Sequence, residues 1–215
     1  MKIIDTRPIK NLEQAAEILN VPLYDIKTLN QVINILKYQN IVFQSPFAVK
    51  NFKCIKKLND KRIIAMGPGT SKELKKFGYI AEQPKSEFNS KGVISLMLKG
   101  DISGNTLVVK GEGGLSEISK YLNSASFKTD EINTYVRVPF KSYDSLKDRF
   151  FQCSAVIFTS SLSVDLYFKY VFQKNENVIY LPISDRIKTS VNSYGHKAKT
   201  INYFAEDLLE EIKTT

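Results

Sequence analysis

One pattern of apolar and polar positions occurs twice along the chain. Residues 41–49 read Ile-Val-Phe-Gln-Ser-Pro-Phe-Ala-Val, and residues 156–164 read Val-Ile-Phe-Thr-Ser-Ser-Leu-Ser-Val. A short apolar run is typical of a buried strand in a parallel sheet, and a serine after it is a favoured helix N-cap. Pro46 suits the first helical position. Each copy therefore predicts a strand that leads into a helix at the carboxyl edge of an α/β sheet, where ligands bind.

The similarity between the two halves continues along the chain. About twenty residues after each copy, a second apolar run precedes a further predicted helix, in residues 62–70 and 178–184. Each half closes with an amphipathic helix, predicted over residues 91–99 and 204–212. A repeat of roughly half the chain indicates two similar α/β domains rather than a solenoid, whose repeats are about 20–50 residues long.

The remaining elements are expected from periodicity and from proline and glycine. Apolar residues spaced as on one helix face predict helices over residues 11–20 and 28–38, and a proline predicts an extended segment at 21–24. Thr70 and Glu73 have the spacing of a capping box, which would start a helix at Thr70. Further strands are predicted over 2–6, 106–110 and 130–138, and further helices over 115–122 and 142–150.

The number of strand–helix units suggests the domain boundaries. One strand and one helix are predicted at the N-terminus, about four units follow before the end of the strand at 130–138, and three come after it. Equal domains result if residues 1–22 join residues 138–215 and residues 23–137 form an inserted domain. Two linkers would then form a hinge, and the cleft beside it is the predicted site. The linkers are expected near residues 20–26 and 134–140.

The composition narrows the class of partner. The chain has 215 residues, 43% of them hydrophobic, and a formal net charge of +9 at pH 7. This excess of positive charge favours an anionic partner, either a nucleic acid or a polycarboxylate or phosphate. Part of it is expected on one side of the helix after Ser45, at Lys50, Lys53 and Lys57. A solvated outer face is the simpler interpretation of these lysines.

Several kinds of chemistry are disfavoured. The single histidine, His196, follows a glycine in a predicted loop and is interpreted as an exposed bystander, which argues against a histidine base or metal site. Cys54 and Cys153 lack metal-ligand spacing and are interpreted as reduced thiols. No apolar run approaches the roughly 20 residues that span a bilayer, and no signal peptide is recognised. We therefore expect a cytoplasmic protein without a metal ion.

Two turns at the ends of predicted strands are candidate anion sites. Gly67-Pro68-Gly69-Thr70 precedes a helix whose first amides could bind an anion, although a capping role explains Thr70 equally well. Gly111-Glu112-Gly113-Gly114 is a glycine-rich turn between a strand and a helix. It lacks the lysine–serine pair of a Walker loop and a full dinucleotide fingerprint. The residues alone leave both interpretations open.

Taken in order, these motifs resemble those of the uroporphyrinogen-III synthase family. Each motif is weak by itself, but the ordered set spans nearly the whole chain and is fairly specific. The matching segments are Phe43-Gln44-Ser45-Pro46, Gly67-Pro68-Gly69-Thr70, Gly111-Glu112-Gly113-Gly114, Tyr135-Val136-Arg137-Val138-Pro139 and Phe158-Thr159-Ser160.

The resemblance implies two α/β domains with parallel sheets, a two-stranded linker and a site in the cleft. It implies that the chain cyclises hydroxymethylbilane, a linear tetrapyrrole with eight carboxylates, and inverts its last pyrrole ring to give uroporphyrinogen III. The family needs no cofactor. A monomer is expected, with hydroxymethylbilane synthase as the upstream partner and with no nucleic acid or membrane.

Site residues are carried over from the family position by position. Tyr135 matches the linker tyrosine and is the candidate acid that assists departure of the substrate hydroxyl; a packed linker aromatic is the alternative interpretation. Substrate carboxylates are expected at hydroxyls and backbone amides of the matched turns, with helix capping as the alternative role. These candidates are Ser45, Pro46, Gly67, Thr70, Gly111, Glu112, Gly113, Ser160, Ser161 and Arg186.

The chain departs from the family pattern in three places. The second domain normally repeats the Gly-Pro-x-Thr turn, but here the aligned residues are Ser184-Asp185-Arg186-Ile187. A hydroxyl is therefore missing at Ile187, and a serine replaces the conformationally free glycine. Arg186 is the candidate replacement for the lost anion contact. Leu115 stands where an arginine is frequent, and Gln44 stands where a threonine is usual.

Two other classes of function fit parts of the sequence. A non-catalytic module that closes on a tetrapyrrole or another polyanion would have the same cleft and would differ only in turnover. A nucleic-acid-binding protein would fit the net positive charge, but the sequence shows neither an aromatic RNA-recognition motif nor a helix-turn-helix pattern.

Overall fold

The chain divides into two compact units in the computed structural model. Met1–Asp25 and Val138–Thr215 form the first unit, and Ile26–Arg137 forms the second. The boundaries between the units thus fall after Asp25 and after Arg137. The sequence suggested boundaries after residues 22 and 137. The residues that the structure describes are 2–8, 16–100, 102–174 and 177–214.

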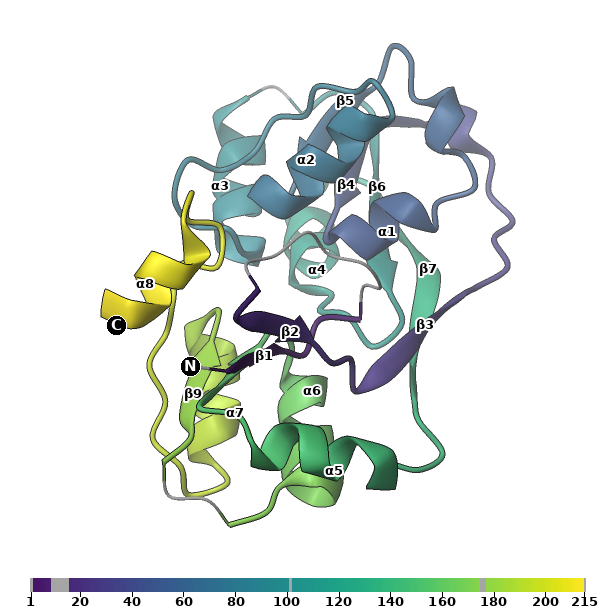
Figure 1. Ribbon diagram of the computed structural model, residues 1–215. Helices are drawn as coiled ribbons and strands as arrows, with labels where there is room; N and C mark the ends of the chain where they lie inside the picture. The colour runs from purple at the N-terminus through teal and green to yellow at the C-terminus, as the bar shows by residue number, and fades with distance from the viewer. Residues whose placement is uncertain (1, 9–15, 101, 175–176, 215) are drawn as a thin grey trace. The chain divides into compact units, whose positions relative to one another are not determined.

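The first unit contains a parallel four-stranded sheet flanked by helices (Figure 1). Its strands are β1 (Ile3–Asp5), β2 (Ile18–Asn20), β8 (Ala155–Phe158) and β9 (Ile179–Pro182), in the order β2-β1-β8-β9. Its helical segments are α5 (Asp144–Phe151), α6 (Ser161–Leu166), η3 (Tyr167–Val171), α7 (Asp185–Asn192) and α8 (Leu208–Thr214).

Alternate residues of these strands enter two different cores, because successive side chains of a strand point to opposite faces. Ile157 and Leu181 pack in a core that includes Ile212 of α8. On the other face, Phe158 stacks with Tyr180 at a centroid distance of 6.2 Å. Both faces are thus covered, which explains why the strands of this unit read as short apolar runs.

The second unit contains a five-stranded sheet. Its strands are β3 (Tyr24–Thr28), β4 (Tyr38–Phe43), β5 (Arg62–Ala65), β6 (Asn105–Gly111) and β7 (Thr129–Pro139), in the order β3-β7-β6-β4-β5. Its helical segments are η1 (Ile35–Lys37), α1 (Pro46–Lys50), η2 (Ile55–Lys57), α2 (Pro68–Lys76), α3 (Ser90–Lys99) and α4 (Glu117–Ser124).

Helices cover both faces of this second sheet (Figure 1). Phe43 packs in one core with Leu74 of α2. Val42, its neighbour in β4, packs in the opposite core with Val93 of α3 and Ile118 of α4. The α/β class with parallel sheets between helices is confirmed.

The repeated strand–serine–helix pattern is also confirmed. After β4, the Ser45 hydroxyl accepts a hydrogen bond from the Ala48 amide at 3.1 Å, and Pro46 is the first residue of α1. After β8, the Ser160 hydroxyl accepts a hydrogen bond from the Ser163 amide, also at 3.1 Å. Both serines are therefore N-caps, as the sequence predicted.

Other expectations are confirmed with shifts at the element ends. Cys54 and Cys153 are free thiols. The strands predicted at 2–6, 106–110 and 130–138 correspond to β1, β6 and β7. The helices predicted at 91–99, 115–122 and 142–150 correspond to α3, α4 and α5.

The helix predicted over residues 28–38 is wrong. Only Ile35–Lys37 is helical there, as the short segment η1. The Leu29 amide donates to the Thr134 carbonyl of β7 at 2.9 Å, which keeps the chain extended beside the sheet. The apolar residues of the predicted face do not share one buried side: Ile33 packs against a core, but Val32 is 94% exposed and Leu36 is 77% exposed.

The helix predicted over residues 11–20 is wrong in its last part. Ile18–Asn20 forms β2 and pairs in parallel with β1. The Ile3 amide donates to the Glu17 carbonyl at 2.9 Å, so that sheet hydrogen bonds replace helical ones. Residues 11–15 lie outside the described part of the chain.

The lysines expected to share one helix face do not share it. α1 ends at Lys50 because the Asn51 amide and side chain both donate to the Phe47 carbonyl, at 3.1 and 2.9 Å. Lys53 lies in the following turn, and Lys57 ends the separate segment η2. The predicted basic stripe is therefore absent from this part of the described chain.

The helix start predicted at Thr70 is also wrong. α2 begins at Pro68, with Gly67 as its N-cap, because proline is well suited to the first helical position. Thr70 is buried within the first turn. Glu73 does not return a capping bond and instead forms an ion pair with Lys76 at 3.1 Å.

Two smaller expectations are corrected in the first unit. His196 is half-buried, and its ring stacks on Phe168 with the centroids 4.9 Å apart, so it is a packed side chain rather than an exposed one. The helix predicted over 204–212 runs instead over Leu208–Thr214, since the Asp207 carboxylate accepts hydrogen bonds from amides at its start.

No helix in the described part of the chain is long and apolar enough to span a membrane.

Neighbouring residues of η1 should differ sharply in their effect on stability. Ile35 is buried in the core, so Ile35→Ala should lower the free energy of unfolding by about 2–4 kcal/mol. Leu36→Ala should change it by less than about 0.5 kcal/mol, because Leu36 is exposed. Urea unfolding measures both, and equal losses would contradict the burial of Ile35 and the exposure of Leu36.

Candidate functional site

The register of the second sheet brings several strand ends to one edge. β4 pairs in parallel with β5 on one side and with β6 on the other, and β6 pairs with β7. The turns at Ser45, Gly67 and Gly111 therefore follow neighbouring strands at the same edge. Gly111 is aligned with Tyr135 of β7, so the sequence-predicted tyrosine also belongs to this edge.

Tyr135 is buried at this edge, with 1% of its surface exposed. Its hydroxyl lies 3.0 Å from the Ser45 hydroxyl. Arg137 donates from Nη2 to the phenol oxygen at 3.2 Å, and its guanidinium lies over the ring, 5.4 Å from the centroid. Because arginine stays charged, it would stabilise negative charge on this oxygen.

The glycine-rich turn makes room for Tyr135. A Cβ atom on Gly111 would lie 2.4 Å from Cζ of the tyrosine ring, a distance that requires displacement. The Glu112 amide donates to the Tyr135 carbonyl at 2.8 Å, which fixes the turn against β7. Gly113 has φ of 70°, a left-handed conformation that favours glycine. The motif is thus required by close packing and by turn geometry.

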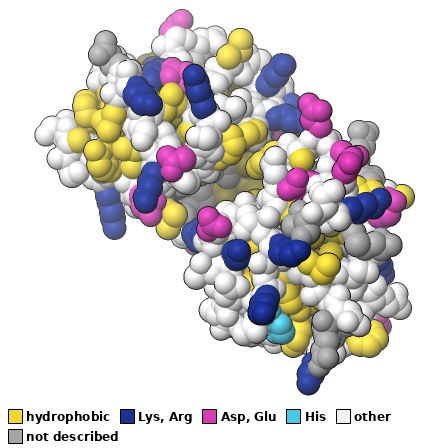
Figure 2. Space-filling view, turned by 90° about the vertical axis from the view of Figure 1, so that its left-hand side faces the viewer, with side chains coloured by type: hydrophobic (Ala, Val, Ile, Leu, Met, Phe, Trp, Pro, Cys, Tyr) yellow, Lys and Arg dark blue, Asp and Glu magenta, His cyan; other side chains and the backbone are white. Residues whose placement is uncertain are grey.

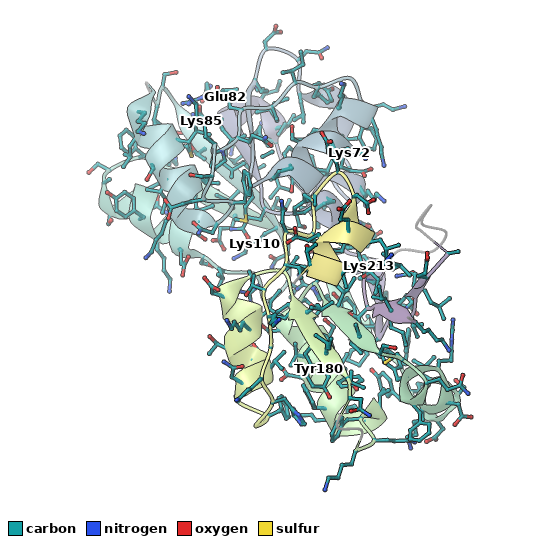
Figure 3. The ribbon with its side chains drawn as sticks, turned by 60° about the vertical axis from the view of Figure 1, so that its left-hand side comes forward. Lys72, Glu82, Lys85, Lys110, Tyr180 and Lys213 are labelled. Carbon is teal, nitrogen blue, oxygen red and sulfur yellow. The ribbon has the colours of Figure 1, made fainter. Side chains whose placement is uncertain are left out.

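A buried lysine that the sequence analysis missed supports the same turn. Lys110, labelled in Figure 3, donates to the Gly114 carbonyl at 3.0 Å and to the Ser116 hydroxyl at 2.6 Å. It also forms an ion pair with Glu131 at 2.6 Å. Burial raises the pKa of Glu131, but hydrogen bonds from Lys110, Ser119 and Ser116 outweigh it, so its pKa is lowered overall. The sequence signal was a lysine in an otherwise apolar strand.

Gln44 and Leu115, two residues that depart from the motifs described above, contact each other. The Gln44 side chain donates from Nε2 to the Leu115 carbonyl at 3.0 Å. Gln44 follows β4 and Leu115 follows the glycine-rich turn, so this bond ties two neighbouring turns together. A threonine side chain at this position would be too short to form the same bond.

The first unit carries a comparable group of hydroxyls at the carboxyl end of β8. The Ser160 hydroxyl lies 3.1 Å from the Tyr24 hydroxyl. Ser190 of α7 donates to the Ser161 hydroxyl at 2.9 Å, and Arg186 donates to it from Nη1 at 3.3 Å. The predicted residues Ser160, Ser161 and Arg186 therefore lie together, and Tyr24 joins them although the sequence analysis did not select it.

The altered turn of the first unit, residues 184–187, keeps the backbone conformation of the Gly-Pro turn at its first residue. Ser184 has φ of −163° and Gly67 has φ of −175°, both extended conformations that any residue adopts, so glycine is not needed for its freedom. Gly67 is instead packed, with Phe88 Cβ 3.0 Å from the place of a Cβ atom. Ile187 is buried, as is its counterpart Thr70.

The sequence analysis also made no prediction of a charged cluster at the end of β1. Asp5 is fully buried and accepts hydrogen bonds from Tyr203 at 2.7 Å and from Arg7 at 3.2 Å. The Arg7 guanidinium lies over the Tyr203 ring, 4.6 Å from its centroid. Burial, followed by the charge of Asp5, raises the pKa of Tyr203. The cluster anchors the C-terminal segment to the central strand of the first sheet.

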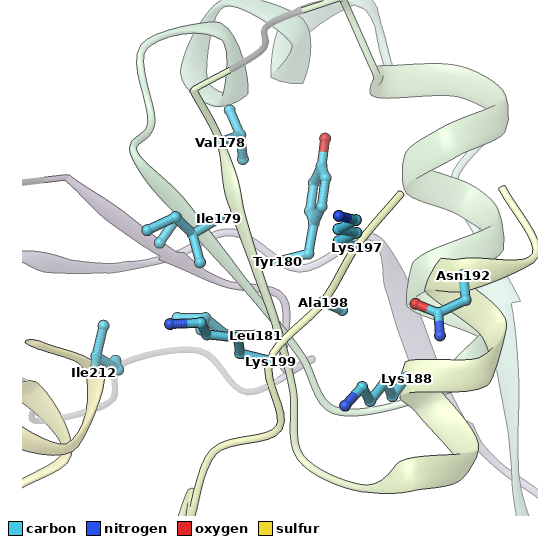
Figure 4. Close-up of a pocket in the computed structure, with 11 residues that line it drawn as sticks. Val178, Ile179, Tyr180, Leu181, Lys188, Asn192, Lys197, Ala198, Lys199 and Ile212 are labelled. Atoms are coloured by element: carbon cyan, nitrogen blue, oxygen red, sulfur yellow. The ribbon is translucent and has the colours of Figure 1, made fainter. Parts of the chain in front are cut away.

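A cavity of about 510 Å³ lies along β9 in the first unit (Figure 4). None of the predicted site residues is among those that line it. Apolar side chains and lysines share its wall: Ala155, Val178, Ile179, Tyr180, Leu181, Lys188, Asn192, Lys197, Ala198, Lys199 and Ile212.

The basic residues do not gather in one patch on the face seen in Figure 2, where lysine and arginine side chains alternate with acidic and apolar ones. This face therefore carries no continuous basic stripe of the kind seen in nucleic-acid-binding proteins. Among the described residues, no group of three or more histidine, cysteine, aspartate or glutamate side chains could hold a metal ion.

Comparison with known proteins identifies the family. The family model described as Uroporphyrinogen-III synthase HemD matches residues 10–210. No curated protein matches the chain closely enough in sequence to be informative.

The solved structures that are similar to the chain include the following two. One is the uroporphyrinogen-III synthetase from Helicobacter pylori, with a TM-score of 0.71 and 14% identity, covering 99% of this chain and 96% of that chain. The other is a mutant uroporphyrinogen III synthase from the extremely thermophilic bacterium Thermus thermophilus, with a TM-score of 0.60 and 12% identity and the same coverage. At this identity, the likeness establishes a shared fold.

The ion pair between Lys110 and Glu131 gives a pH-dependent prediction. Glu131→Gln should lower the free energy of unfolding by about 1–3 kcal/mol at pH 7, because Lys110 is then buried without its counter-charge. The lowered pKa of Glu131 means that its contribution is present above the usual carboxyl pKa and is lost as the pH falls through the folded value.

The difference between wild type and Glu131→Gln should therefore shrink at low pH. Urea unfolding at pH 7 and near pH 3.5 measures this. The exposed Glu117 is the control, and Glu117→Gln should change stability by less than about 0.5 kcal/mol. A loss of equal size at both pH values would contradict the role of the ion pair.

Proposed function

The chain belongs to the uroporphyrinogen-III synthase family, and from this premise we propose which of its side chains act on the substrate. The enzyme is a cyclising lyase. It converts hydroxymethylbilane into uroporphyrinogen III, with inversion of the last pyrrole ring, in tetrapyrrole and haem biosynthesis. The observation that carries the proposal is the contact of Tyr135 with both Ser45 and Arg137.

Tyr135 is proposed as the acid for the first step. The hydroxymethyl group of the substrate loses its oxygen poorly as hydroxide but readily as water, so a proton donor speeds the step. The phenol gives its proton to the departing oxygen, the carbon–oxygen bond breaks, and an azafulvenium cation is left on the substrate. The resulting phenolate is stabilised by Arg137, which already donates to the same oxygen at 3.2 Å.

Ser45 is proposed to set the direction of this proton. Its hydroxyl oxygen accepts from the Ala48 amide at 3.1 Å, which leaves its own proton free for a donor bond. If that proton points to the Tyr135 oxygen, 3.0 Å away, the tyrosine proton points to the substrate. Ser45 and Arg137 would then both donate to the phenol oxygen as it becomes negative.

Ring closure is proposed to depend mainly on positioning. The cation is attacked by the last ring to give the spiro intermediate, and rearrangement with loss of a carbon-bound proton gives the product. The phenolate of Tyr135 can take up a proton, so acid and base balance over one turnover. Holding the chain so that spiro closure outcompetes direct closure is catalysis by orientation.

The substrate carboxylates are proposed to bind at the turns that follow the strands. Arg186 supplies charge beside Ser161, and the other donors are hydroxyls and backbone amides of the turns. The net charge of +9 favours such a ligand. The proposed binding residues are Ser45, Pro46, Gly67, Thr70, Gly111, Glu112, Gly113, Ser160, Ser161 and Arg186.

The setting of the reaction is also a proposal. The protein would act in the cytoplasm as a monomer and without a cofactor. Its substrate would come directly from hydroxymethylbilane synthase, because free hydroxymethylbilane closes unaided to isomer I. Rapid transfer to this enzyme would limit that loss.

The decisive test uses hydroxymethylbilane generated in a coupled assay. The products are oxidised, and uroporphyrin isomers I and III are separated by chromatography. The enzyme should give mainly isomer III, whereas the assay without it should give isomer I. Only isomer I from the folded protein would refute the catalytic function and favour a non-catalytic tetrapyrrole-binding relative.

The acid role of Tyr135 is tested by Tyr135→Phe. Loss of general acid catalysis should lower kcat about 100-fold or more, while the loss of one hydroxyl should cost only about 0.5–1.5 kcal/mol of stability. The matched control is Tyr38→Phe in the same unit. Tyr38 is also buried and donates to Asp130 at 2.8 Å, and its loss should leave kcat nearly unchanged. Unchanged turnover in folded Tyr135→Phe would exclude the acid role.

A further inference from the structure

The two units contain the same pairing of a serine with a tyrosine. In each unit, a buried parallel strand ends, an N-cap serine follows, and its hydroxyl meets a tyrosine hydroxyl. The distances are 3.0 Å between Ser45 and Tyr135 and 3.1 Å between Ser160 and Tyr24. Both tyrosines are buried, with 1% and 2% of their surfaces exposed. The sequence repeat contains the two serines but not Tyr24, so this pairing is visible only in the structure.

The hydrogen bonds around Ser160 show what Tyr24 can do for it. A serine hydroxyl has two acceptor positions and one proton. One position accepts from the Ser163 amide at 3.1 Å, and the other can accept from Tyr24 at 3.1 Å. The proton of Ser160 is then the group left to donate. With Tyr24 as the donor of this contact, the serine hydroxyl is fixed as a donor.

The hydroxyl oxygen of the neighbouring Ser163 can accept a hydrogen bond from that proton. The Ser163 hydroxyl donates its own proton to the Ser160 carbonyl at 2.7 Å, so its oxygen is available as an acceptor. The two serine hydroxyl oxygens lie 3.1 Å apart. A stronger acceptor, such as a carboxylate, could draw the proton of Ser160 away from Ser163 by a small rotation of the hydroxyl.

The surroundings of the pair suit an anion. Ser161 follows Ser160 directly, and Arg186 donates to its hydroxyl at 3.3 Å. An arginine is always charged and binds carboxylates well. A donor-only serine, next in the chain to a serine that a guanidinium contacts, therefore matches a carboxylate better than a neutral group or a cation.

We propose that Tyr24 is a positioning residue that orients the Ser160 hydroxyl toward a carboxylate of the linear tetrapyrrole. The inference rests on the proposed function, because the carboxylate belongs to its substrate. Tyr24 and Tyr135 then have different tasks within similar pairs. Arg137 stabilises the phenolate of Tyr135, which suits proton transfer, whereas Tyr24 acts through Ser160 in substrate binding.

Steady-state kinetics of Tyr24→Phe test the proposal. KM for hydroxymethylbilane should rise about three- to tenfold, the range expected for loss of one neutral hydrogen bond, while kcat changes less than about twofold. The matched control is Tyr143→Phe. Tyr143 is a buried tyrosine of the same unit whose hydroxyl donates to the Leu23 carbonyl at 2.8 Å. This variant should lose similar thermal stability and keep the wild-type KM.

A double variant decides whether Tyr24 acts through Ser160. Ser160→Ala should raise KM by itself, and adding Tyr24→Phe to it should raise KM no further, because residues that act as one unit are not additive. An unchanged KM in Tyr24→Phe, an equal rise in Tyr143→Phe, or additive effects in the double variant would each overturn the proposal. Failure of the proposed function is distinguishable, because wild-type protein would then form only isomer I.

Discussion

The packing of the Tyr135 ring against Gly111 is the constraint on which the rest of the second unit's edge depends. The two residues are aligned on neighbouring parallel strands, and the ring occupies the space that any Cβ on Gly111 would need. This contact places the phenol oxygen beside Ser45 and Arg137. For the acid role proposed for Tyr135, a phenol held so firmly would lose little entropy on reaching a reactive geometry.

The ion pair between Lys110 and Glu131 also stabilises the glycine-rich turn. Lys110 reaches the carbonyl of Gly114 and the hydroxyl of Ser116, and Glu131 on β7 balances its charge. A buried charge is tolerated only with such partners. The same residues therefore connect β6, β7 and the start of α4.

The two halves share an architecture but differ in their chemistry. Each places an N-cap serine after a buried strand and pairs it with a tyrosine. The second unit keeps the Gly-Pro turn and the phenol with its arginine. The first unit replaces that turn with Ser184 and Ile187 and gathers Arg186 with two serines instead. The altered turn retains an extended backbone, which explains how the substitution fits the fold.

The sequence by itself determined the strand–serine–helix junctions and the parallel α/β class, because these depend on local periodicity. The family followed from the resemblance of the ordered motifs to those of its members. The sequence analysis failed at residues 28–38, where an apolar spacing suggested a helix but hydrogen bonds to β7 kept the chain extended. It also placed the start of α2 at Thr70, since a capping pattern can be present where a proline nearby starts the helix earlier. Only the tertiary structure decided that Tyr24 meets Ser160, that Lys110 holds the glycine turn and that Arg7 joins Asp5 and Tyr203. Most of these partners are far apart along the chain, and their distances follow from sheet order and register, which local sequence patterns do not encode.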